Sequence, residues 1–486
     1  MAYRGLREFL DRLEEAGDLH RVRVEVDPLL EVAAITDRQS KAPGGGKALL
    51  FERVSGSRFP VATNLLGSYR RVCTALKVEE LTELTARVTE LLAGVSGGSS
   101  GDTISALLGS RAFARFAPQP VTRGACQEVV EDVPDLAALP ALKSWPGDGE
   151  PGYDGRFITL PLVCTRDPET GRANCGIYLA QLLSRDTIGV RWRAGSGAAG
   201  HWQKYRDRGE RMPVAIALGG DPALLFAAAA PLPGAIDEMQ FAGFLRNEPV
   251  EMVCCRTSDI MCPADAELVI EGEVDPRVTR SGGAFGNHTG FYLPPEELPV
   301  MRVTCITRRR TPVFPATVVG PPPMEDCYLA KGVERLMLPF LRLDLPEIVE
   351  INLPLEGIFH GAAVVSIDKR QPGQARRVME ALWSGGWLSG SRLLVVVDAE
   401  LDPHDLSRVY WKVLNSTEWR RDVVMYDAAG GRLAQVSSLP CGGRLGIDAT
   451  RKLPEELAAE WPREIAMDEA VRKLVEKRWR EYGFGE

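Results

Sequence analysis

Basic and glycine residues gather at the end of a strand-like stretch, residues 174–197, which reads NCGIYLAQLLSRDTIGVRWRAGSG. Arg191 and Arg193 flank the end of an apolar run, and Gly195 and Gly197 follow. Glycines let backbone N–H groups converge on an anion, and guanidinium groups balance its charge. The chemistry that this spacing would support is the binding of a phosphate. On spacing alone, however, a Gly/Ser loop that binds nothing is the commoner outcome.

A β-hairpin is predicted to hold this basic loop in place. Its first apolar run covers residues 177–183, a polar turn follows at 184–187, and a second run covers 188–192. Two short apolar runs joined by a polar turn are typical of a hairpin. The basic residues would then lie where the second strand ends.

The composition is that of a globular chain, because 45% of its 486 residues are hydrophobic and 26% are charged, which suits about three domains. The formal net charge of −8 argues against nucleic acid as a partner, since phosphate backbones select basic surfaces. The ten cysteines form no C-x-x-C motif, and the adjacent pair Cys254 and Cys255 is neither a zinc motif nor a disulfide framework. The N-terminus is charged, and prolines interrupt the apolar stretch 223–236. We therefore expect a cytoplasmic protein without a membrane span.

Alternating helix and strand patterns predict an α/β unit that ends near residue 115. Asp27 and Pro28 are expected to start its second helix as N-cap and first helical residue, and glycine and serine at 94–102 indicate a loop or boundary. The predicted helices are 6–13, 27–38 and 81–92, and the predicted strands are 22–26 and 48–54.

Closely spaced strands from residue 156 predict a barrel-like sheet, and after Pro323 the α/β alternation returns. A terminal helix at 468–482 carries an apolar stripe, which we expect to dock either on another subunit or on its own domain. Besides the hairpin, the predicted strands are 157–165, 212–218, 250–255, 267–274, 300–307, 313–319, 348–353, 362–367 and 393–398, with helices at 224–230 and 237–246.

Several long blocks carry a resemblance to a known family. They are LREFLDRLEEAGDL, EVDPLLEVAAITDR, ALLFERV, NCGIY, IDEMQFAGFLR, PADAELVIEGEV, GNHTGFY and GRLGIDAT. In these blocks the chain resembles the UbiD family of prenylated-FMN-dependent decarboxylases over essentially its whole length. The resemblance implies an α/β (α+β) fold with an N-terminal α/β domain at 1–115, a flavin-reductase-like split β-barrel that binds the cofactor at 116–322, and a C-terminal α/β domain at 323–486. The last helix would contact a partner subunit in a homodimer or homohexamer.

The resemblance also implies a metal and cofactor site. Asn174 matches the family's asparagine ligand, and Glu238 its carboxylate ligand, to a divalent metal that bridges to the phosphate of prenylated FMN. These hard oxygen donors suit Mn²⁺ or Mg²⁺, and K⁺ would accompany it. Without the resemblance, both side chains would more often be capping or solvated groups. The positions that match the family's cofactor contacts are Ile177, Tyr178, Leu179, Arg191, Trp192, Arg193, Ser196, Gly197 and, where the family has a lysine, Arg444.

Three positions where the family carries ionisable catalytic groups hold other residues here. Leu179 stands where the family has the arginine that orients the substrate carboxylate, Gly282 where it has a glutamate, and Asn287 where it has the acid that returns a proton to carbon. An asparagine cannot act as a general acid near neutral pH, and a leucine cannot pair with a carboxylate. Changed or lost chemistry is therefore expected.

Other groups could supply the proton. His288 adjoins Asn287, and imidazole has a suitable pKa, although a structural hydrogen bond is the commoner role for this histidine. His360 has no role that the resemblance transfers. Glu325 and Asp326 follow a proline-rich segment, where first-turn helix acids are the usual interpretation. A water molecule is an equal alternative.

Three functions remain open. The first is a decarboxylase or reversible carboxylase of an aromatic, heteroaromatic or α,β-unsaturated carboxylic acid, with its cofactor supplied by a flavin prenyltransferase. The second is a prenylated-FMN enzyme that catalyses a different reaction. The third is a non-catalytic UbiD-like subunit of a larger complex. The retained Asn174, Glu238, Arg191 and Arg444 favour the first two, because a structural subunit would not need them.

Overall fold

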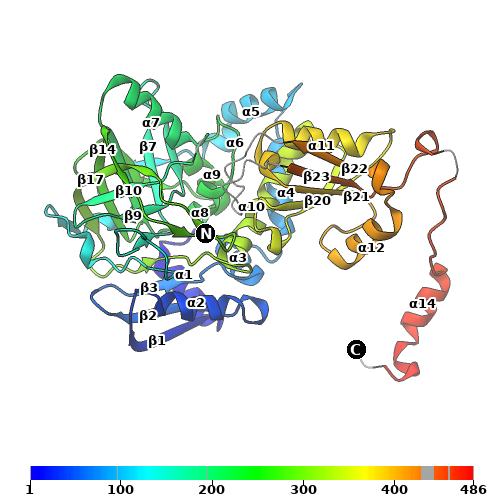
Figure 1. Ribbon diagram of the computed structural model, residues 1–486, viewed down its shortest axis with the longest axis horizontal. Helices are drawn as coiled ribbons and strands as arrows, with labels where there is room; N and C mark the ends of the chain where they lie inside the picture. The colour runs from blue at the N-terminus through cyan, green and yellow to red at the C-terminus, as the bar shows by residue number, and fades with distance from the viewer. Residues whose placement is uncertain (1, 96, 194, 428–442, 458–459, 485–486) are drawn as a thin grey trace.

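A computed structural model describes residues 2–95, 97–193, 195–427, 443–457 and 460–484. These residues form fourteen α-helices and five sheets, arranged as an N-terminal part, a central part built on the largest sheet, and a C-terminal part (Figure 1). The mixed α/β class expected from the sequence is confirmed. Within the described ranges, no helix has the length and apolar character needed to cross a bilayer.

The N-terminal part contains a four-stranded sheet, in the order β1-β2-β3-β18, whose last strand is Phe314–Pro315, and six helices. Of these helices, α5 and α6 lie away from the sheet (Figure 1). The spacing of Leu6, Phe9, Leu10 and Leu13 predicts a buried stripe, and all of these residues are buried. Its elements are α1 (Leu6–Glu15), β1 (Leu19–Val26), α2 (Glu31–Ser40), β2 (Ala48–Val54), β3 (Val61–Thr63), α3 (Tyr69–Leu76), α4 (Thr82–Ala93), α5 (Ser100–Gly109) and α6 (Arg111–Ala114).

Two expectations for this part are wrong. Helix α2 begins at Glu31 and not at Pro28, because Leu30 has a left-handed backbone (φ 76°) that cannot continue a right-handed helix. Asp27 instead accepts a hydrogen bond from the backbone of Leu29 through its side chain (2.7 Å). Helix α5 begins inside the predicted loop, because Ser99 provides its N-cap.

The central sheet has nine strands, in the order β6-β9-β10-β17-β14-β11-β7-β8, with β5 paired to β17. Successive residues of a strand point to opposite faces of a sheet, and here each face packs against a hydrophobic core. Val214, Ile216 and Leu218 belong to one core, and Ala215 and Ala217 belong to the other. The predicted hairpin is confirmed, because β9 and β10 pair antiparallel. The strands are β5 (Val129–Glu131), β6 (Phe157–Ile158), β7 (Leu162–Arg166), β8 (Ala173–Gly176), β9 (Ala180–Leu182), β10 (Thr187–Val190), β11 (Met212–Leu218), β14 (Leu268–Ser281) and β17 (Glu297–Arg308).

Three of the predicted barrel strands differ in the structure. The stretch 157–165 is divided between β6 and β7, since Pro161 has no N–H to donate. The stretch 250–255 forms β12 (Glu251–Cys254) in a separate sheet with β13 (Met261–Pro263) and β4 (Gln119–Val121). The stretch 313–319 forms only β18 (Phe314–Pro315), which pairs with β3 of the N-terminal sheet.

Two helices of the central part begin at candidate site residues, Gly197 and Glu238. The helices of this part are α7 (Gly197–Arg208), α8 (Ala223–Ala229) and α9 (Glu238–Arg246), the last two close to their predicted bounds. The side chain of Asp237 caps α9 by accepting from the backbone of Gln240 (2.8 Å). Strands β15 (Phe285–Gly286) and β16 (Tyr292–Leu293) form a short hairpin, and the loop between them carries Asn287 and His288.

The C-terminal part is a five-stranded sheet, in the order β19-β20-β21-β23-β22, with helices on both faces. The three predicted strands are confirmed as β19, β20 and β21. The elements are α10 (Glu325–Asp344), β19 (Ile348–Asn352), β20 (Ala362–Ile367), α11 (Gln374–Ser384), β21 (Leu393–Asp398), α12 (Leu406–Ser416), α13 (Trp419–Asp422), β22 (Val423–Asp427) and β23 (Gly443–Asp448).

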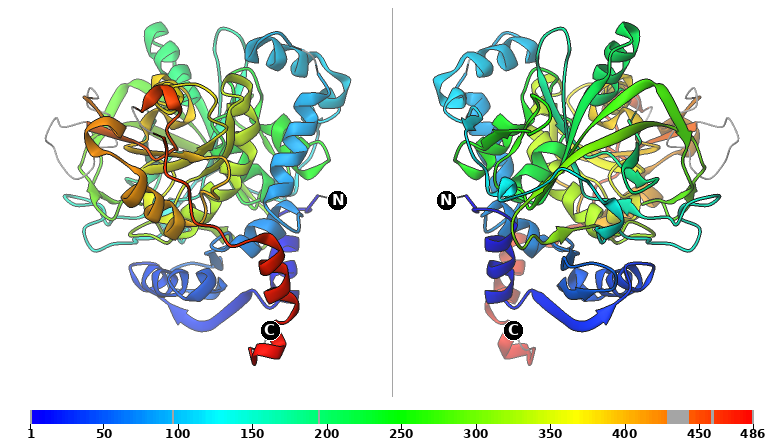
Figure 2. Two further views of the ribbon diagram at one scale, coloured as in Figure 1. Left: turned by 90° about the vertical axis from the view of Figure 1, so that its right-hand side faces the viewer. Right: turned by 90° about the vertical axis from the view of Figure 1, so that its left-hand side faces the viewer.

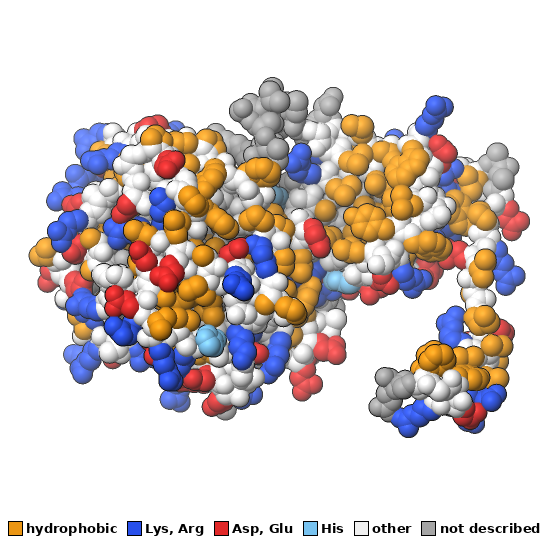
Figure 3. Space-filling model, turned by 60° about the horizontal axis from the view of Figure 1, so that its bottom comes forward, with side chains coloured by type: hydrophobic (Ala, Val, Ile, Leu, Met, Phe, Trp, Pro, Cys, Tyr) orange, Lys and Arg blue, Asp and Glu red, His pale blue; other side chains and the backbone are white. Residues whose placement is uncertain are grey.

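The terminal helix α14 (Glu469–Lys477) stands away from the rest of the chain (Figures 1 and 2). Residues 462–484 are all exposed, so the alternative that this helix folds back on its own domain is wrong. Hydrophobic side chains gather on it and on the face of the C-terminal part (Figure 3). The exposed apolar residues include Val471, Leu474, Val475 and Trp479 on the terminal segment and Tyr410, Trp411 and Leu414 on α12. An exposed apolar stripe of this kind favours a protein–protein contact.

We expect Leu474→Asp to convert an oligomer to a monomer, because it places a charge in the centre of this stripe. The molar mass measured by light scattering during size-exclusion chromatography decides this. Lys473→Asp is the matched control, since Lys473 lies on the same helix and pairs with Glu469. An unchanged mass for Leu474→Asp would show that the stripe does not form the subunit contact.

Candidate functional site

Two side chains predicted to bind a metal come together at the start of two helices. Asn174 lies on β8 against the first turn of α7, so closely that a Cβ at Gly197 would stand 2.0 Å from its Oδ1 atom. Glu238 is the first residue of α9, and its Oε2 accepts a hydrogen bond from the backbone N–H of Cys175 (3.2 Å). The structure therefore brings Asn174, Gly197 and Glu238 to one place, although they are far apart along the chain.

The donor set at this place fits a hard divalent cation. Burial raises the pKa of Glu238 to about 7, and the neighbouring Asp237 adds to the rise. The Nδ2 atom of Asn174 is buried and has no hydrogen-bond partner among the described residues. Within those residues, no cluster of three or more His, Cys, Asp or Glu side chains could hold a metal. A cation here would therefore take its other oxygen ligands from a phosphate and water, as Mg²⁺ commonly does.

The loop before α7 has the geometry of an anion site. Gly195 is in the left-handed region (φ 79°), and the side chain of Ser196 caps the helix by accepting from the backbone of Ala199 (3.3 Å). The helix runs for twelve residues, and its first N–H groups and dipole favour a negative charge. A phosphate at this end would lie beside Asn174.

Donors without partners line the approach to this loop. The Nε1 atom of Trp192 and the Nη2 atom of Arg191 are buried without a hydrogen-bond partner among the described residues. Arg191 also forms an ion pair with Glu296 (Nε to Oε1, 2.7 Å), and burial lowers the pKa of its guanidinium. Buried donors are normally satisfied, so these atoms indicate a missing acceptor such as a bound ligand.

The three residues matched to the family's cofactor strip come directly before β9 and alternate in exposure. Ile177 and Leu179 are partly exposed, whereas Tyr178 is buried and packs edge-on against Trp192, with ring centroids 5.6 Å apart. The backbone of Leu179 accepts from Arg191 N–H (3.0 Å), which ties the strip to the basic loop. Arg193 is exposed at the start of this loop.

The space at the second changed position is filled. A Cβ at Gly282 would stand 2.4 Å from the side chain of Leu298, so a glutamate could not occupy this position without moving that leucine. Asn287 is 3% exposed, and its Oδ1 accepts from the backbone of His288 (2.6 Å). Its Nδ2 atom has no partner among the described residues.

His288 meets His360, which sequence reasoning could not pair. Their Nε2 atoms lie 2.9 Å apart, and Phe359 packs against the His288 ring at 4.7 Å between centroids. Burial lowers the pKa of His288 to about 3 and that of His360 to about 4. Both imidazoles are therefore neutral at pH 7. The two residues lie 72 positions apart, and no periodic pattern connects such positions.

The remaining candidates make contacts with other parts of the chain. Arg444 lies on β23, where its guanidinium donates to the carbonyl of Trp383 (3.2 Å) inside the C-terminal part. Glu325 and Asp326 open α10, as the first-turn interpretation expects. Glu325 accepts from the backbone of Leu66 (2.8 Å), and burial raises the pKa of Asp326 to about 7.

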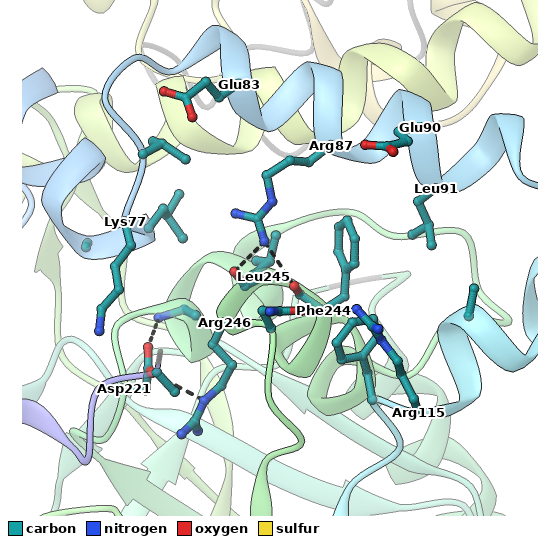
Figure 4. Close-up of a pocket in the computed structure, with 18 of the residues that line it drawn as sticks. Lys77, Glu83, Arg87, Glu90, Leu91, Arg115, Asp221, Phe244, Leu245 and Arg246 are labelled. Atoms are coloured by element: carbon teal, nitrogen blue, oxygen red, sulfur yellow. Dashed lines mark hydrogen bonds and ion pairs between the residues drawn. The ribbon is translucent and has the colours of Figure 1, made fainter.

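A cavity of about 610 Å³ lies away from the predicted site, at the other end of α9 (Figure 4). Arg87 there donates to the carbonyls of Phe244 and Leu245 (3.1 and 2.8 Å), and Arg246 pairs with Asp221 (3.4 Å). These arginines are held by protein acceptors. None of the predicted site residues lines this cavity.

Known proteins resemble this chain over its full length. A protein of Archaeoglobus fulgidus, described only as uncharacterized, is 44% identical over 485 residues, which is 99% of each chain. The UbiD-class enzyme HmfF of Pelotomaculum thermopropionicum, in an evolved dimeric form with prFMN, has a TM-score of 0.79 at 29% identity, covering 97% of this chain and 98% of HmfF.

The vanillic acid decarboxylase of Sedimentibacter hydroxybenzoicus is 26% identical to this chain and is known in two forms. Its closed form has a TM-score of 0.88 and covers all of both chains. Its open form has a TM-score of 0.80 and covers 99% of both.

Three family models match successive parts of the chain. They are the N-terminal domain of 3-octaprenyl-4-hydroxybenzoate carboxy-lyase at residues 10–91, its Rift-related domain at 119–322 and its C-terminal domain at 327–449. The chain belongs to the UbiD family.

Proposed function

We propose that this protein is a prenylated-FMN-dependent carboxy-lyase, able to run as a carboxylase, that acts on an aromatic, heteroaromatic or α,β-unsaturated carboxylic acid. The observation that carries the proposal is the meeting of Asn174, Glu238 and the start of α7. The complex of HmfF with prFMN supports the same ligand. A flavin prenyltransferase would supply it.

The chain's own residues would hold the cofactor by its phosphate end. Ser196 and the first N–H groups of α7 would take the phosphate. The carbonyl oxygen of Asn174 and the carboxylate of Glu238 would hold Mn²⁺ or Mg²⁺ against it, with K⁺ alongside. The free donors of Arg191 and Trp192 would point to the flavin side of the site. When bound, prenylated FMN supplies the electron sink for loss of CO₂.

The changed residues predict a different substrate preference from that of relatives with the usual catalytic groups. Leu179 offers no guanidinium to a carboxylate, and a charge-assisted hydrogen bond of this kind contributes about 1.5–3 kcal/mol. Its absence would weaken recognition of the carboxylate by about ten- to a hundredfold. An apolar wall would also leave the carboxylate poorly solvated, which favours its loss as CO₂.

We also propose that the arrangement seen here corresponds to a closed state. The vanillic acid decarboxylase supports this, because its closed form has the higher TM-score, 0.88 against 0.80 for the open form. In this state the C-terminal part meets the central part through His360 and His288. Closure of this kind excludes water from a site.

We expect the cofactor-loaded protein to release CO₂ from some member of a panel of aromatic and heteroaromatic acids, but hardly from cinnamate-type or 4-hydroxybenzoate-type acids. The reason is that Leu179, Gly282 and Asn287 provide neither a guanidinium nor a carboxylic acid. Incubation in D₂O, with mass spectrometry and NMR of the products, follows CO₂ release and deuterium entry at the reacting carbon.

The same experiment identifies the proton donor. Deuterium entry that falls about a hundredfold or more in His288→Ala assigns the donor to His288, because general acid catalysis contributes an effect of this size. Entry that does not change in this variant points to water. Neither CO₂ release nor exchange across the panel, from protein shown to carry the cofactor, would contradict the carboxy-lyase.

A further inference from the structure

His288 is held firmly by the central part of the chain. The backbone N–H of Asn287 donates to Phe291 (3.0 Å), and Gly290 donates back to Asn287 (2.9 Å), which closes a tight loop. The preceding Gly286 donates to the buried Asp148 (2.6 Å). A shift of His288 would therefore also shift the carboxamide of Asn287, whose Oδ1 atom accepts from the His288 backbone.

Backbone hydrogen bonds within the C-terminal part hold the loop that carries His360. This loop lies between a short 3₁₀ turn (Leu355–Gly357) and β20, and Gly361 donates to the carbonyl of Gly357 (2.7 Å). The carbonyl of Gly361 accepts from Leu393 at the start of β21 (3.1 Å). A Cβ at Gly361 would stand 2.8 Å from Gly357 O, so this loop has little room to rearrange.

The hydrogen bond between the two rings therefore reports on the distance between two domains. A separation of 2.9 Å between nitrogen atoms is within the normal range, and a shift of about 1 Å breaks such a bond. One ring must donate from Nε2 and the other must present a lone pair there, which requires at least one neutral imidazole. The contact thus exists only when the C-terminal part covers the Asn287–His288 loop.

We propose that His360 is a positioning residue that couples closure of the C-terminal domain to the alignment of Asn287 and His288 at the reacting end of the site. This inference rests on the proposed function, since it assigns Asn287 and His288 to that end. His360 acts through His288 and not on the substrate. The C-terminal domain, which carries His360, would thereby complete the site only when it covers the Asn287–His288 loop.

The contact should weaken in acid. In this contact both imidazoles have a pKa below the usual 6.5, about 4 for His360 and about 3 for His288. The closed state therefore binds fewer protons than the open state. The stability of the contact is therefore complete above about pH 6.5 and is lost as the pH falls toward 4. The charged groups near His360 are Arg193 and Arg392, which oppose its protonation.

Hydrogen–deuterium exchange of the full-length protein tests the inference without any need for activity. We expect residues 287–293 and 355–361 to be protected at pH 7.5 and to exchange faster at pH 5.5, after correction for the intrinsic rates. His360→Ala should speed exchange in 287–293 by about two- to tenfold at pH 7.5, the value of one lost hydrogen bond.

Two further variants separate the hydrogen bond from simple packing. His360→Gln should keep the protection of wild type at pH 7.5 and lose the part of its pH dependence that His360 contributes, because an amide can donate or accept but does not titrate. The part that comes from His288 should remain. His404→Gln is the matched control, since His404 is an exposed histidine of the same domain that contacts Arg335. It should behave as wild type.

Turnover provides the second readout where wild type releases CO₂. His360→Ala should then lower kcat more than it changes KM, and His360→Gln should restore kcat. The inference would be overturned if His360→Ala matched wild type in both exchange and turnover. It would also be overturned if residues 287–293 exchanged as fast in His360→Gln as in His360→Ala. Absence of CO₂ release by wild type would contradict the proposed function alone, and the exchange measurements would still decide the role of His360.

Discussion

Protein with Glu238→Ala should be purified without flavin and without metal, even after co-expression with a flavin prenyltransferase. Glu238 provides the only carboxylate that we assign to the cation, and its Oε2 lies against the backbone of the residue after Asn174. Loss of a residue in the second shell of a metal site costs about ten- to a hundredfold in affinity, so loss of this direct ligand should cost more than about a hundredfold. Metal analysis and the flavin absorbance of the purified protein measure both effects.

Glu248→Ala is the matched control for this change. Glu248 is exposed just beyond the other end of α9, about 12 Å or more along the helix axis from Glu238. It should retain flavin and metal as wild type does. A Glu238→Ala protein with full metal and flavin content would remove Glu238 from the metal site.

Gly197→Ala should both destabilise the protein and abolish flavin binding. The added methyl group would stand 2.0 Å from Oδ1 of Asn174, so either the asparagine or the first turn of α7 has to move. Overpacking of this kind typically costs about 1–3 kcal/mol in the free energy of unfolding. Either movement would also separate the proposed metal ligand from the proposed phosphate loop. Denaturant unfolding and flavin content of the same preparation test both consequences.

A second glycine of the same helix provides the control. Gly200 is exposed, and an added Cβ there meets no atom within 4 Å. Gly200→Ala should stabilise the protein by about 0.5–1 kcal/mol through helix propensity and keep its flavin. If Gly197→Ala instead gained stability and kept flavin as Gly200→Ala does, the close contact with Asn174 would have no functional role.

The fold could be predicted from the sequence wherever a local pattern determines the structure. The stretch that forms β11 is a short apolar run of alternating large and small residues, which predicts a strand. Asp237 is a capping residue directly before the apolar positions of α9, which predicts the start of that helix. Both elements lie close to their predicted bounds. Errors arose where the partner is distant. The short strand β18 leaves the barrel to pair with β3, more than two hundred residues earlier, and no local signal specifies that pairing.

The site shows the same division. The resemblance to the family selects Asn174 and Glu238, which by themselves look like ordinary surface residues. The close contact of Gly197 with Asn174 and the pairing of His288 with His360 depend on how separate elements pack, so the sequence contains no sign of either. The pKa of Glu238 is likewise a consequence of burial in the folded chain.

The most direct measurement is the flavin and metal content of the wild-type chain after co-expression with a flavin prenyltransferase. Absorbance spectroscopy and mass spectrometry identify the flavin, and elemental analysis identifies the metal. We predict about one prenylated FMN and one Mn²⁺ or Mg²⁺ for each chain, because Asn174, Glu238 and the start of α7 form a single site. Protein that is consistently free of flavin and metal under these conditions would contradict the proposed function.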